Sequence, residues 1–360
     1  MKLKWIRWIF ILIGVLLFIF LSVLSHWSPQ KTDSIYNNEG QIIENSISKI
    51  ENIEINGVSQ RVVIRGWDKN NPVLLHLHGG PGNPDRPFIR RLNAHVEDLF
   101  TVIYWDQRGI GGSYHKDIEP HSISLVQIAD DGIVISEYFK ERFNKDKIYI
   151  QGHSWGTAVG ITMAQKRPDL FHAYIGIGQM ASSARSEKIS YQYALEEAHK
   201  AHNEKDIKVL NDIGSPPYLE ENWIENMLKQ RQILWKYENP ENPVEQSMFQ
   251  IYMVYIMHPE YSIFDKIGML KGAGLAMKYL WDDAMNIDFF KTVPNLDLPI
   301  YIIQGKYDKH TSTVVAKTYF DSLNAPLKQY FEFEKSAHAP HFEEYNRYKK
   351  ILREEVLKLN

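Results

Sequence analysis

A serine lies at the centre of the pentapeptide GHSWG, residues 152–156, which has the pattern G-x-S-x-G. The pentapeptide directly follows the β-branched run KIYIQ at 147–151 and precedes TAVGITMAQKR at 157–167, which has a helical composition. A strand, a turn and a helix in this order are the setting of a nucleophile elbow, which exposes a serine hydroxyl between small neighbours. We therefore predict that Ser154 is a nucleophile. The alternative is an ordinary glycine turn that carries a serine.

A serine hydroxyl is a weak nucleophile without a general base, so a histidine and a carboxylate must accompany it. With a nucleophile elbow, these partners follow in the order Asp or Glu, then His. Asp308 comes just after the strand-like run PIYIIQ at 299–304. His338 follows the run QYFEF at 329–333 in the same way. We predict that His338 transfers the proton and that Asp308 orients its imidazole.

Other residues compete for these two roles. His341, three positions after His338, is the main rival for the base. His310 is only two residues from Asp308, which leaves too little chain for it to fold back onto the carboxylate. Asp297 precedes its predicted strand and is therefore expected at the wrong end of the sheet.

A second glycine-rich segment, HGGPG at 78–82, follows the predicted strand VLLHLH at 73–78. Glycines let backbone N–H groups approach a ligand oxygen closely. Such a loop, together with the amide that follows the nucleophile, can form an oxyanion hole. We predict this role for the amides of Gly80 and Trp155. A phosphate-binding loop is disfavoured because neither Gly-Lys-Ser/Thr nor G-x-G-x-x-G follows.

These residues must be positioned by the elements that precede them. Seven short runs rich in β-branched and aromatic residues predict buried strands, with helical stretches between many of them. The runs lie at residues 61–67, 73–78, 100–105, 147–151, 173–177, 299–304 and 329–333. This pattern predicts an α/β fold, with a mostly parallel sheet and helices on both faces. The carboxyl ends of parallel strands share one edge, where α/β sheets assemble their sites.

The pattern changes between residues 183 and 292, where helical spacing replaces the strand signals. We predict a helical cap inserted into the core at this point. The expected organisation is a membrane anchor at 1–27, a polar stalk at 28–50, the first part of the core at 51–182, the cap at 183–292 and the second part of the core at 293–360.

Residues 8–24, WIFILIGVLLFIFLSVL, carry no charge and would span about 26 Å as a helix, at the short end for a bilayer. Lys2, Lys4 and Arg7 precede this run, so the positive-inside rule places the N-terminus in the cytoplasm. We predict a single-pass anchor in the cell membrane with the catalytic domain outside the cytoplasm. The alternative is a secreted protein whose signal peptide is removed, but the run is long and no A-x-A site follows it.

The composition excludes several classes of function. The 360 residues are 44% hydrophobic and 24% charged, which suits a folded globular protein. The net charge of −3 offers no basic excess for a nucleic acid. Because cysteine is absent, the chain has no disulfide, cysteine nucleophile, iron–sulfur cluster or thiolate zinc site.

Three motifs together resemble the proline iminopeptidases among the α/β-hydrolase serine peptidases: HGGPG at 78–82, DQRGIGGS at 106–113 and GHSWG at 152–156. The resemblance covers roughly residues 50–180 and 293–345. It implies the α/β-hydrolase fold, a Ser-Asp-His triad, a helical cap over the site, and neither metal nor cofactor. It also implies release of an N-terminal residue, often proline, from peptides.

The resemblance also assigns supporting roles. It implies that Asp106 and Arg108 hold the loops beside the site, so both are treated as structural. In this family a glutamate after an aromatic residue in the cap binds the α-ammonium of the substrate, and Glu238 in WKYE at 235–238 is similar in position. Asp282 and Asp283 are weaker candidates.

Two positions depart from the family pattern. Ala337 stands where a glycine usually precedes the catalytic histidine, and His153 replaces the second glycine of GGSWG.

Together these features predict a membrane-anchored serine aminopeptidase that acts on small peptides. The nearest alternative is a carboxylesterase or another amide hydrolase with the same triad. A third is a catalytically inactive binding protein at the cell surface. Epoxide hydrolases and dehalogenases are disfavoured because they carry Asp at the position of the nucleophile.

Overall fold

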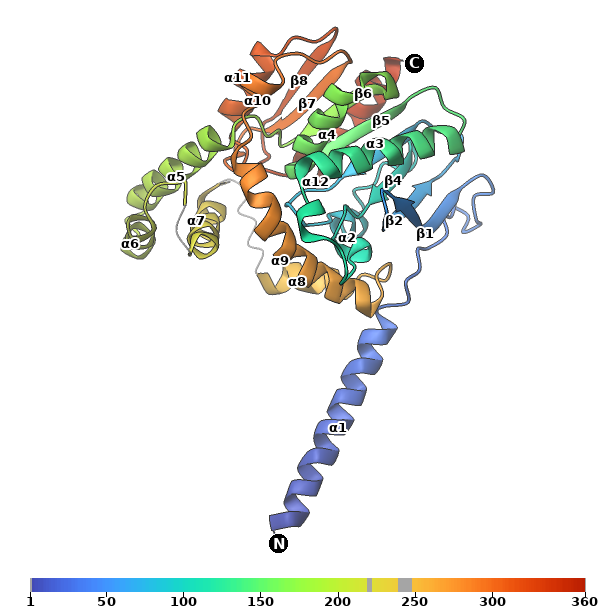
Figure 1. Cartoon of the computed structure of the whole chain (residues 1–360), viewed down its shortest axis with the longest axis vertical. Coiled ribbons are helices and arrows are strands. Elements are labelled where there is room, and N and C mark those ends of the chain that lie inside the picture. Colours follow the sequence, from blue (N-terminus) through green and yellow to red (C-terminus); the bar gives the residue numbers. More distant parts are fainter. Residues whose placement is uncertain (1, 219–221, 239–247, 360) are drawn as a thin grey trace.

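An eight-stranded sheet forms the centre of the protein (Figure 1). A computed structural model describes residues 2–218, 222–238 and 248–359. The strand order is β1-β2-β4-β3-β5-β6-β7-β8. The strands are β1 (Ile47–Ile55), β2 (Val58–Gly66), β3 (Val73–Leu77), β4 (Thr101–Trp105), β5 (Ile148–His153), β6 (Phe171–Ile177), β7 (Ile300–Gly305) and β8 (Lys328–Phe333). Pairs β1–β2 and β2–β4 are antiparallel and the other neighbours are parallel, which confirms a mostly parallel sheet.

Helices follow most of the strands. They are α1 (Lys2–His26), α2 (Arg86–Arg91), α3 (Leu125–Arg142), α4 (Trp155–Lys166), α5 (Ser183–Lys200), α6 (Glu204–Ile213), α7 (Trp223–Tyr237), α8 (Met248–Ile256), α9 (Ile263–Met285), α10 (Phe289–Thr292), α11 (Thr313–Ser322), α12 (Pro340–Glu343) and α13 (Tyr345–Ile351). Short 3₁₀ turns span Gly111–Ser113, Pro120–Ser122, Pro168–Leu170 and Leu357–Leu359, and a π-helical turn spans Leu352–Val356.

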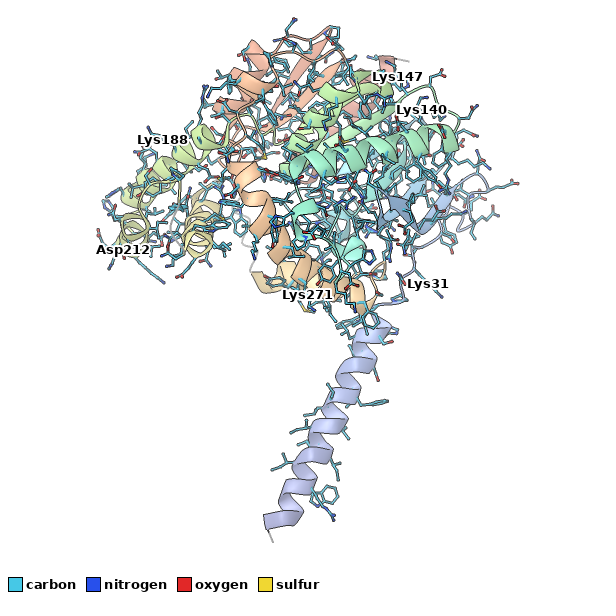
Figure 2. All side chains as sticks on the ribbon, viewed as in Figure 1. Lys31, Lys140, Lys147, Lys188, Asp212 and Lys271 are labelled. Atoms are coloured by element: carbon cyan, nitrogen blue, oxygen red, sulfur yellow. The ribbon has the colours of Figure 1, made fainter. Side chains whose placement is uncertain are left out.

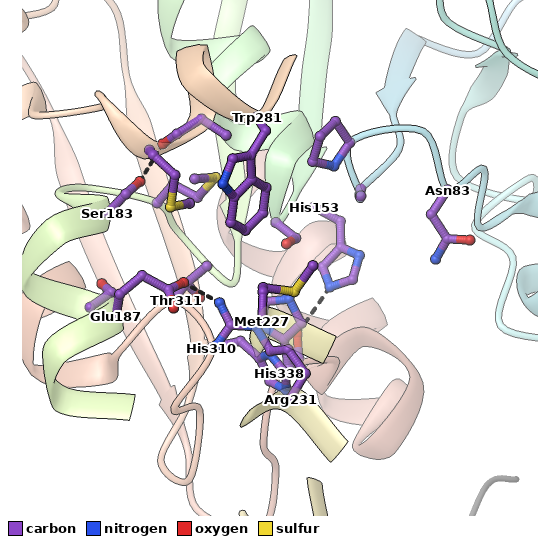
Figure 3. A pocket seen from close by; sticks show the side chains of 18 of the residues that line it. Asn83, His153, Ser183, Glu187, Met227, Arg231, Trp281, His310, Thr311 and His338 are labelled. Atoms are coloured by element: carbon purple, nitrogen blue, oxygen red, sulfur yellow. Dashed lines mark hydrogen bonds and ion pairs between the residues drawn. The ribbon is translucent and has the colours of Figure 1, made fainter. Parts of the chain in front are cut away.

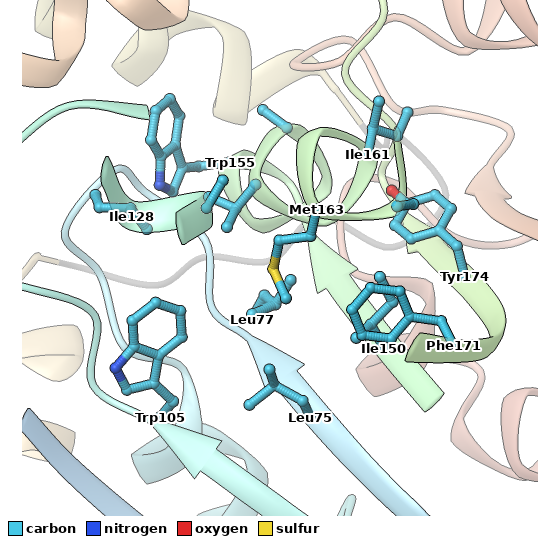
Figure 4. Packing of buried hydrophobic residues seen from close by; sticks show 14 of the residues in the cluster. Leu75, Leu77, Trp105, Ile128, Ile150, Trp155, Ile161, Met163, Phe171 and Tyr174 are labelled. Carbon is cyan, nitrogen blue, oxygen red and sulfur yellow. The ribbon is translucent and has the colours of Figure 1, made fainter. Parts of the chain in front are cut away.

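The central strands are buried on both faces because helices cover each side of the sheet. Leu75 of β3 packs in one apolar cluster with Trp155 and Met163 of α4 (Figure 4). The adjacent Leu74 packs on the opposite face, in a cluster that includes Tyr348 of α13. Successive side chains of a strand point to opposite faces, so a continuous apolar run fits a strand that is covered on both sides.

One strand, β1, is absent from the prediction, and it corrects the boundary of the predicted stalk. The stalk was placed at residues 28–50, but β1 begins at Ile47, and Ile35 is buried against the body. The carbonyl of Asp33 also accepts a hydrogen bond from Arg65 Nη1 at 2.6 Å. As an edge strand, β1 pairs only with β2, so its side chains are mostly half-buried or exposed and form no continuous apolar run.

Helices α5 to α10 lie between β6 and β7, which confirms a helical insertion at this point of the core. Three of them, α5, α6 and α7, pack around a small cluster of their own that includes Tyr191, Leu210 and Leu234. In Figure 1 these three helices lie to one side of the sheet, apart from the helices that cover its faces.

The N-terminal helix α1 projects from the body (Figure 1), and its described side chains stand clear of it (Figure 2). Its segment Arg7–His26 has 20 residues, a mean hydropathy of 2.8 and no burial within the protein. A membrane span and a signal sequence both have these properties.

Candidate active site

The GHSWG segment forms a tight turn between β5 and α4. Ser154 has φ 52° and ψ −118°, in the region with positive φ that L-residues rarely adopt. A Cβ atom on Gly152 would lie 2.2 Å from the Gly156 carbonyl oxygen. A Cβ atom on Gly156 would lie 2.0 Å from the carbonyl oxygen of Leu77. Only glycine fits at both positions, which is the physical basis of the G-x-S-x-G spacing.

His338 and Asp308 form a hydrogen-bonded pair at the ends of β8 and β7. His338 Nδ1 lies 3.0 Å from Asp308 Oδ2. The buried carboxylate also accepts hydrogen bonds from the Thr311 amide at 3.0 Å, the Thr311 hydroxyl at 2.7 Å and Gln304 Nε2 at 2.7 Å. Burial alone would raise the pKa of Asp308, but the charge and hydrogen bond of His338 outweigh it and hold that pKa far below its ordinary value.

Ser154 and His338 line the same cavity, which has a volume of about 420 Å³. Figure 3 shows His338 among the side chains that line it. Among the described residues, no hydrogen bond joins the Ser154 hydroxyl to the imidazole, although His338 pairs with Asp308. Contacts of this kind are often long before substrate binds and tighten in the reacting complex. The structure thus brings the three predicted residues to one edge of the sheet, with Asp308 behind His338.

The HGGPG loop lies against the elbow. A Cβ atom on Gly79 would lie 3.3 Å from Ser154 Cβ, and the next residue, Gly80, also lines the cavity. Trp155 is the first residue of α4, so its N–H group has no acceptor within the helix. Both amides predicted for an oxyanion hole are therefore close to Ser154 in the chain or in space.

The DQRG segment ties this loop to the elbow. Trp155 Nε1 donates to Gln107 Oε1 at 3.1 Å, and Gln107 Nε2 donates to the carbonyl of His78 at 3.1 Å. Asp106 accepts hydrogen bonds from the Tyr261 hydroxyl at 2.8 Å and the Gly112 amide at 3.0 Å.

The second charged residue of this segment is anchored away from the cavity. Arg108 Nε lies 2.6 Å from Asp131 Oδ2, and both side chains are buried. Neither Asp106 nor Arg108 lines the cavity, in keeping with a structural role.

The structure does not place Glu238 on the cavity wall, contrary to the predicted role in binding the substrate amine. Its Oε1 accepts a hydrogen bond from the Lys309 amide at 2.9 Å, and its Oε2 lies 3.2 Å from His310 Nε2. Asp282 and Asp283 also lie off the wall. The residues next to Glu238 in the sequence could not predict that it lies off the wall. Its position depends on the direction of α7, which is set by how the cap helices pack.

Within the described part of the chain, the carboxylates that line the cavity belong to Asp85 and Glu187. Glu187, on α5, is paired with Arg231 Nη2 of α7 (Figure 3), and both side chains line the cavity. Arg231 Nη1 is buried without a hydrogen-bond partner among the described residues. Nothing in the spacing of these residues along the sequence predicts that they meet.

The residues that compete with His338 and Asp308 for their predicted roles are less well placed. His341 is buried, lies off the cavity wall, and has its pKa lowered well below the ordinary value, first by burial and then by the charge of His153. His310 lines the cavity, but its Nε2 faces Glu238. Asp297 is exposed and precedes β7, at the opposite end of that strand from Asp308.

Residues 72–345 match the family model of the α/β hydrolase fold. The match covers more than half of the chain, and the chain therefore belongs to the α/β-hydrolase family. This confirms the fold implied by the three motifs.

The resemblance to proline iminopeptidases is confirmed by curated relatives. Over 300 residues the chain is 33% identical to the probable aminopeptidase YbaC of Bacillus subtilis strain 168, covering 83% of this chain and 93% of that protein. It is 28% identical over 307 residues to a proline iminopeptidase of Saccharolobus solfataricus, covering 81% and 86%. A crystal structure of a proline iminopeptidase-related protein from Thermus thermophilus is similar with a TM-score of 0.61 and 18% identity, covering 87% and 98%, and supports the fold alone.

Proposed function

We propose that the protein is a serine aminopeptidase of the proline iminopeptidase type, which cleaves an N-terminal residue, often proline, from small peptides. The observation that carries this proposal is the His338–Asp308 pair at 3.0 Å, because His338 lines the same cavity as Ser154. The names of the curated relatives support the substrate class.

In the proposed mechanism, Ser154 Oγ attacks the substrate carbonyl while His338 Nε2 accepts the hydroxyl proton. The ionised Asp308 holds the ring by its Nδ1–H group and stabilises the imidazolium that forms. The amides of Gly80 and Trp155 bind the oxyanion of the tetrahedral intermediate. His338 then protonates the leaving amine, the acyl-enzyme forms, and a water molecule activated by the same histidine releases the product.

An aminopeptidase must recognise the α-ammonium of its substrate, and we assign this role to Glu187 in place of Glu238. Its carboxylate lies on the cavity wall, and one oxygen is already oriented by Arg231. A cavity of about 420 Å³ suits one or two residues of a peptide.

A substrate panel tests the proposal. Prolyl- and alanyl-anilides with a free amine are compared with their N-acetylated forms and with short-chain nitrophenyl esters. We expect the free-amine anilides to be cleaved and the N-acetylated forms to be cleaved far more slowly. Turnover of esters alone would instead identify a carboxylesterase, and failure of Ser154 to react with a fluorophosphonate would identify an inactive binding protein.

We also propose that α1 anchors the protein in the cell membrane with the catalytic domain outside the cytoplasm. Lys266, at the start of α9, donates a hydrogen bond to the carbonyl of Trp27 at 2.6 Å, so α9 begins beside the end of the apolar helix. Phe264, Ile267 and Leu270 of α9 are 83%, 44% and 65% exposed, and their spacing suits contact of one helix face with a bilayer surface.

Extraction and protection experiments test this anchor. We expect the protein to resist extraction of membranes with alkaline carbonate and to be digested by protease added outside intact cells. A secreted form whose mass lacks the first residues would instead identify a cleaved signal peptide.

A further inference from the structure

Three polar side chains from separate segments meet beside the wall of the cavity. Asp85 precedes α2, His153 ends β5, and His341 lies in α12. One nitrogen or oxygen atom from each residue lies within 4.8 Å of the others. Asp85 and His341 are 6% and 2% exposed, and the His153 side chain is 12% exposed.

The hydrogen bonds around this cluster leave several of its nitrogen and oxygen atoms without a partner. His153 Nε2 lies 3.0 Å from the carbonyl oxygen of His338 (Figure 3), which can only accept, so Nε2 carries the proton. His153 Nδ1 then offers a lone pair in the neutral ring. It lies 3.7 Å from Asp85 Oδ2, too far for a hydrogen bond. Asp85 Oδ2 and both nitrogens of His341 have no hydrogen-bond partner among the described residues.

The outer contacts of the cluster orient its members. Gln151 Nε2 lies 3.2 Å from His76 Nδ1, so the amide donates there and the proton of His76 lies on Nε2. His76 Nε2 in turn lies 2.7 Å from Asp85 Oδ1, which leaves Oδ2 free to face the histidines. Ligating carboxylates and imidazoles in metal sites are held by outer hydrogen bonds of this kind.

We propose that Asp85, His153 and His341 bind a divalent first-row transition ion, with Zn²⁺ as the best-matched probe. Two imidazole nitrogens and one carboxylate oxygen are a donor set that Zn²⁺ accepts. Zinc bonds of about 2.0–2.1 Å in a tetrahedron place ligand atoms about 3.3 Å apart, close to the 3.7 Å between His153 Nδ1 and Asp85 Oδ2. The three ligand atoms lie within 4.8 Å of one another, so they must move closer together to complete the site.

The cavity offers the ion a route and a fourth ligand. Asp85 and His153 both line its wall, so an ion can enter from the substrate side and keep a water molecule as its remaining ligand. The ion takes no part in the proposed acyl transfer. It links α2, the end of β5 and α12, and it fixes His153, whose N–H group binds the carbonyl of His338.

Metal titration of the full-length protein in detergent micelles tests this site. Zn²⁺ affinity is measured by competition with a chromogenic chelator, and Co²⁺ is added separately to record its visible absorption. The variants are His341→Gln, Asp85→Asn and His76→Gln. His310→Gln is the matched control, because His310 lines the same cavity but lies outside the cluster. Circular dichroism checks that each variant folds.

We expect one Zn²⁺ per chain, tetrahedral Co²⁺ bands and a rise in the unfolding temperature with added zinc. His341→Gln and Asp85→Asn should each weaken binding by more than about 100-fold, and His76→Gln by about 10–100-fold. His310→Gln should bind as the wild type does. The proposal is overturned if the wild type does not bind one Zn²⁺ per chain. It is also overturned if His310→Gln abolishes Zn²⁺ binding while folded His341→Gln or Asp85→Asn retains it.

Discussion

The two walls of the cavity are built in different ways. The sheet wall presents Ser154 and His338 on loops that directly follow β5 and β8, and Asp308 supports them from the end of β7. The opposite wall consists of side chains from separate helices, such as Glu187 of α5 and Trp281 of α9. The first wall is fixed by backbone that is paired in the sheet, whereas the second depends on how helices pack.

Under the proposed function, the two walls have different tasks. Groups that must stabilise a transition state need a fixed position before the substrate arrives, and strand ends supply it. Groups that choose among substrates can lie on helices that vary without disturbing the chemistry. Substitutions on the sheet wall should therefore lower kcat, and substitutions on the helical wall should mainly raise KM.

The largest effect is expected from His338→Gln. The variant removes the proposed base of the Ser154 hydroxyl, so kcat should fall by about 10⁴–10⁶-fold while KM changes only a few-fold. Steady-state kinetics on a cleaved anilide measure both constants. His341→Gln is the matched variant, and near-complete loss of activity in His341→Gln with activity kept in His338→Gln would show that the base is assigned to the wrong histidine.

A smaller loss is expected from Gln107→Met, which keeps the side-chain volume but removes both amide contacts. The carbonyl of His78 and the indole of Trp155 lose their buried partner, so the amides proposed to bind the oxyanion become less well positioned. We expect kcat to fall by about 10–100-fold, as kinetics on the same anilide would show. An unchanged kcat in a folded variant would mean that the DQRG segment does not position the hole.

On the helical wall, Glu187→Gln should raise KM for free-amine substrates by about 10-fold or more. A lost charge-assisted hydrogen bond costs about 1.5–3 kcal/mol, whereas ester substrates without an amine lose nothing. Glu238→Gln is the comparison, because Glu238 lies behind His310 and off the wall. If Glu238→Gln alone raises KM, the family-based assignment of Glu238 is right and the cavity-based assignment of Glu187 is wrong.

The sheet wall could be predicted from the sequence because short segments of the sequence determine the positions of its residues. A nucleophile turn needs glycines at fixed spacing, and Asp308 and His338 each follow an apolar run that becomes a strand of the sheet. Strand β1 was not predicted, because an edge strand needs no continuous apolar run.

The helical wall and the cluster of Asp85, His153 and His341 could not be predicted from short segments of the sequence. Glu187 and Arg231 meet only because α5 and α7 pack together, and Glu238 turns toward Lys309 for the same reason. Asp85 and His341 are 256 positions apart and have no motif spacing, so only the assembled fold brings them together.

The smallest effect concerns stability against pH. The pKa of Asp308 is depressed in the folded protein, so its ionised form stabilises the fold above the ordinary value of about 3.9, and this contribution is lost as the pH falls below it. The free energy of unfolding should therefore decline less steeply between pH 5 and 3 in Asp308→Asn than in the wild type. The matched control is Glu225→Gln, because the pKa of this exposed acid of α7 is lowered by its hydrogen bond to Lys229, and an exposed pair contributes little to stability, so the slope should change far less. Denaturant titrations at several pH values would measure these slopes, and equal slopes in all three proteins would contradict the account.

Labelling by a fluorophosphonate tests whether Ser154 is a nucleophile that His338 activates, with the site and rate of labelling read by intact mass and peptide mapping. We expect one adduct per chain on Ser154, no adduct in Ser154→Ala, and labelling of His338→Gln slowed by several orders of magnitude. Rapid labelling of Ser154→Ala would show that Ser154 is not the nucleophile, and labelling of His338→Gln at the wild-type rate would show that His338 is not its base.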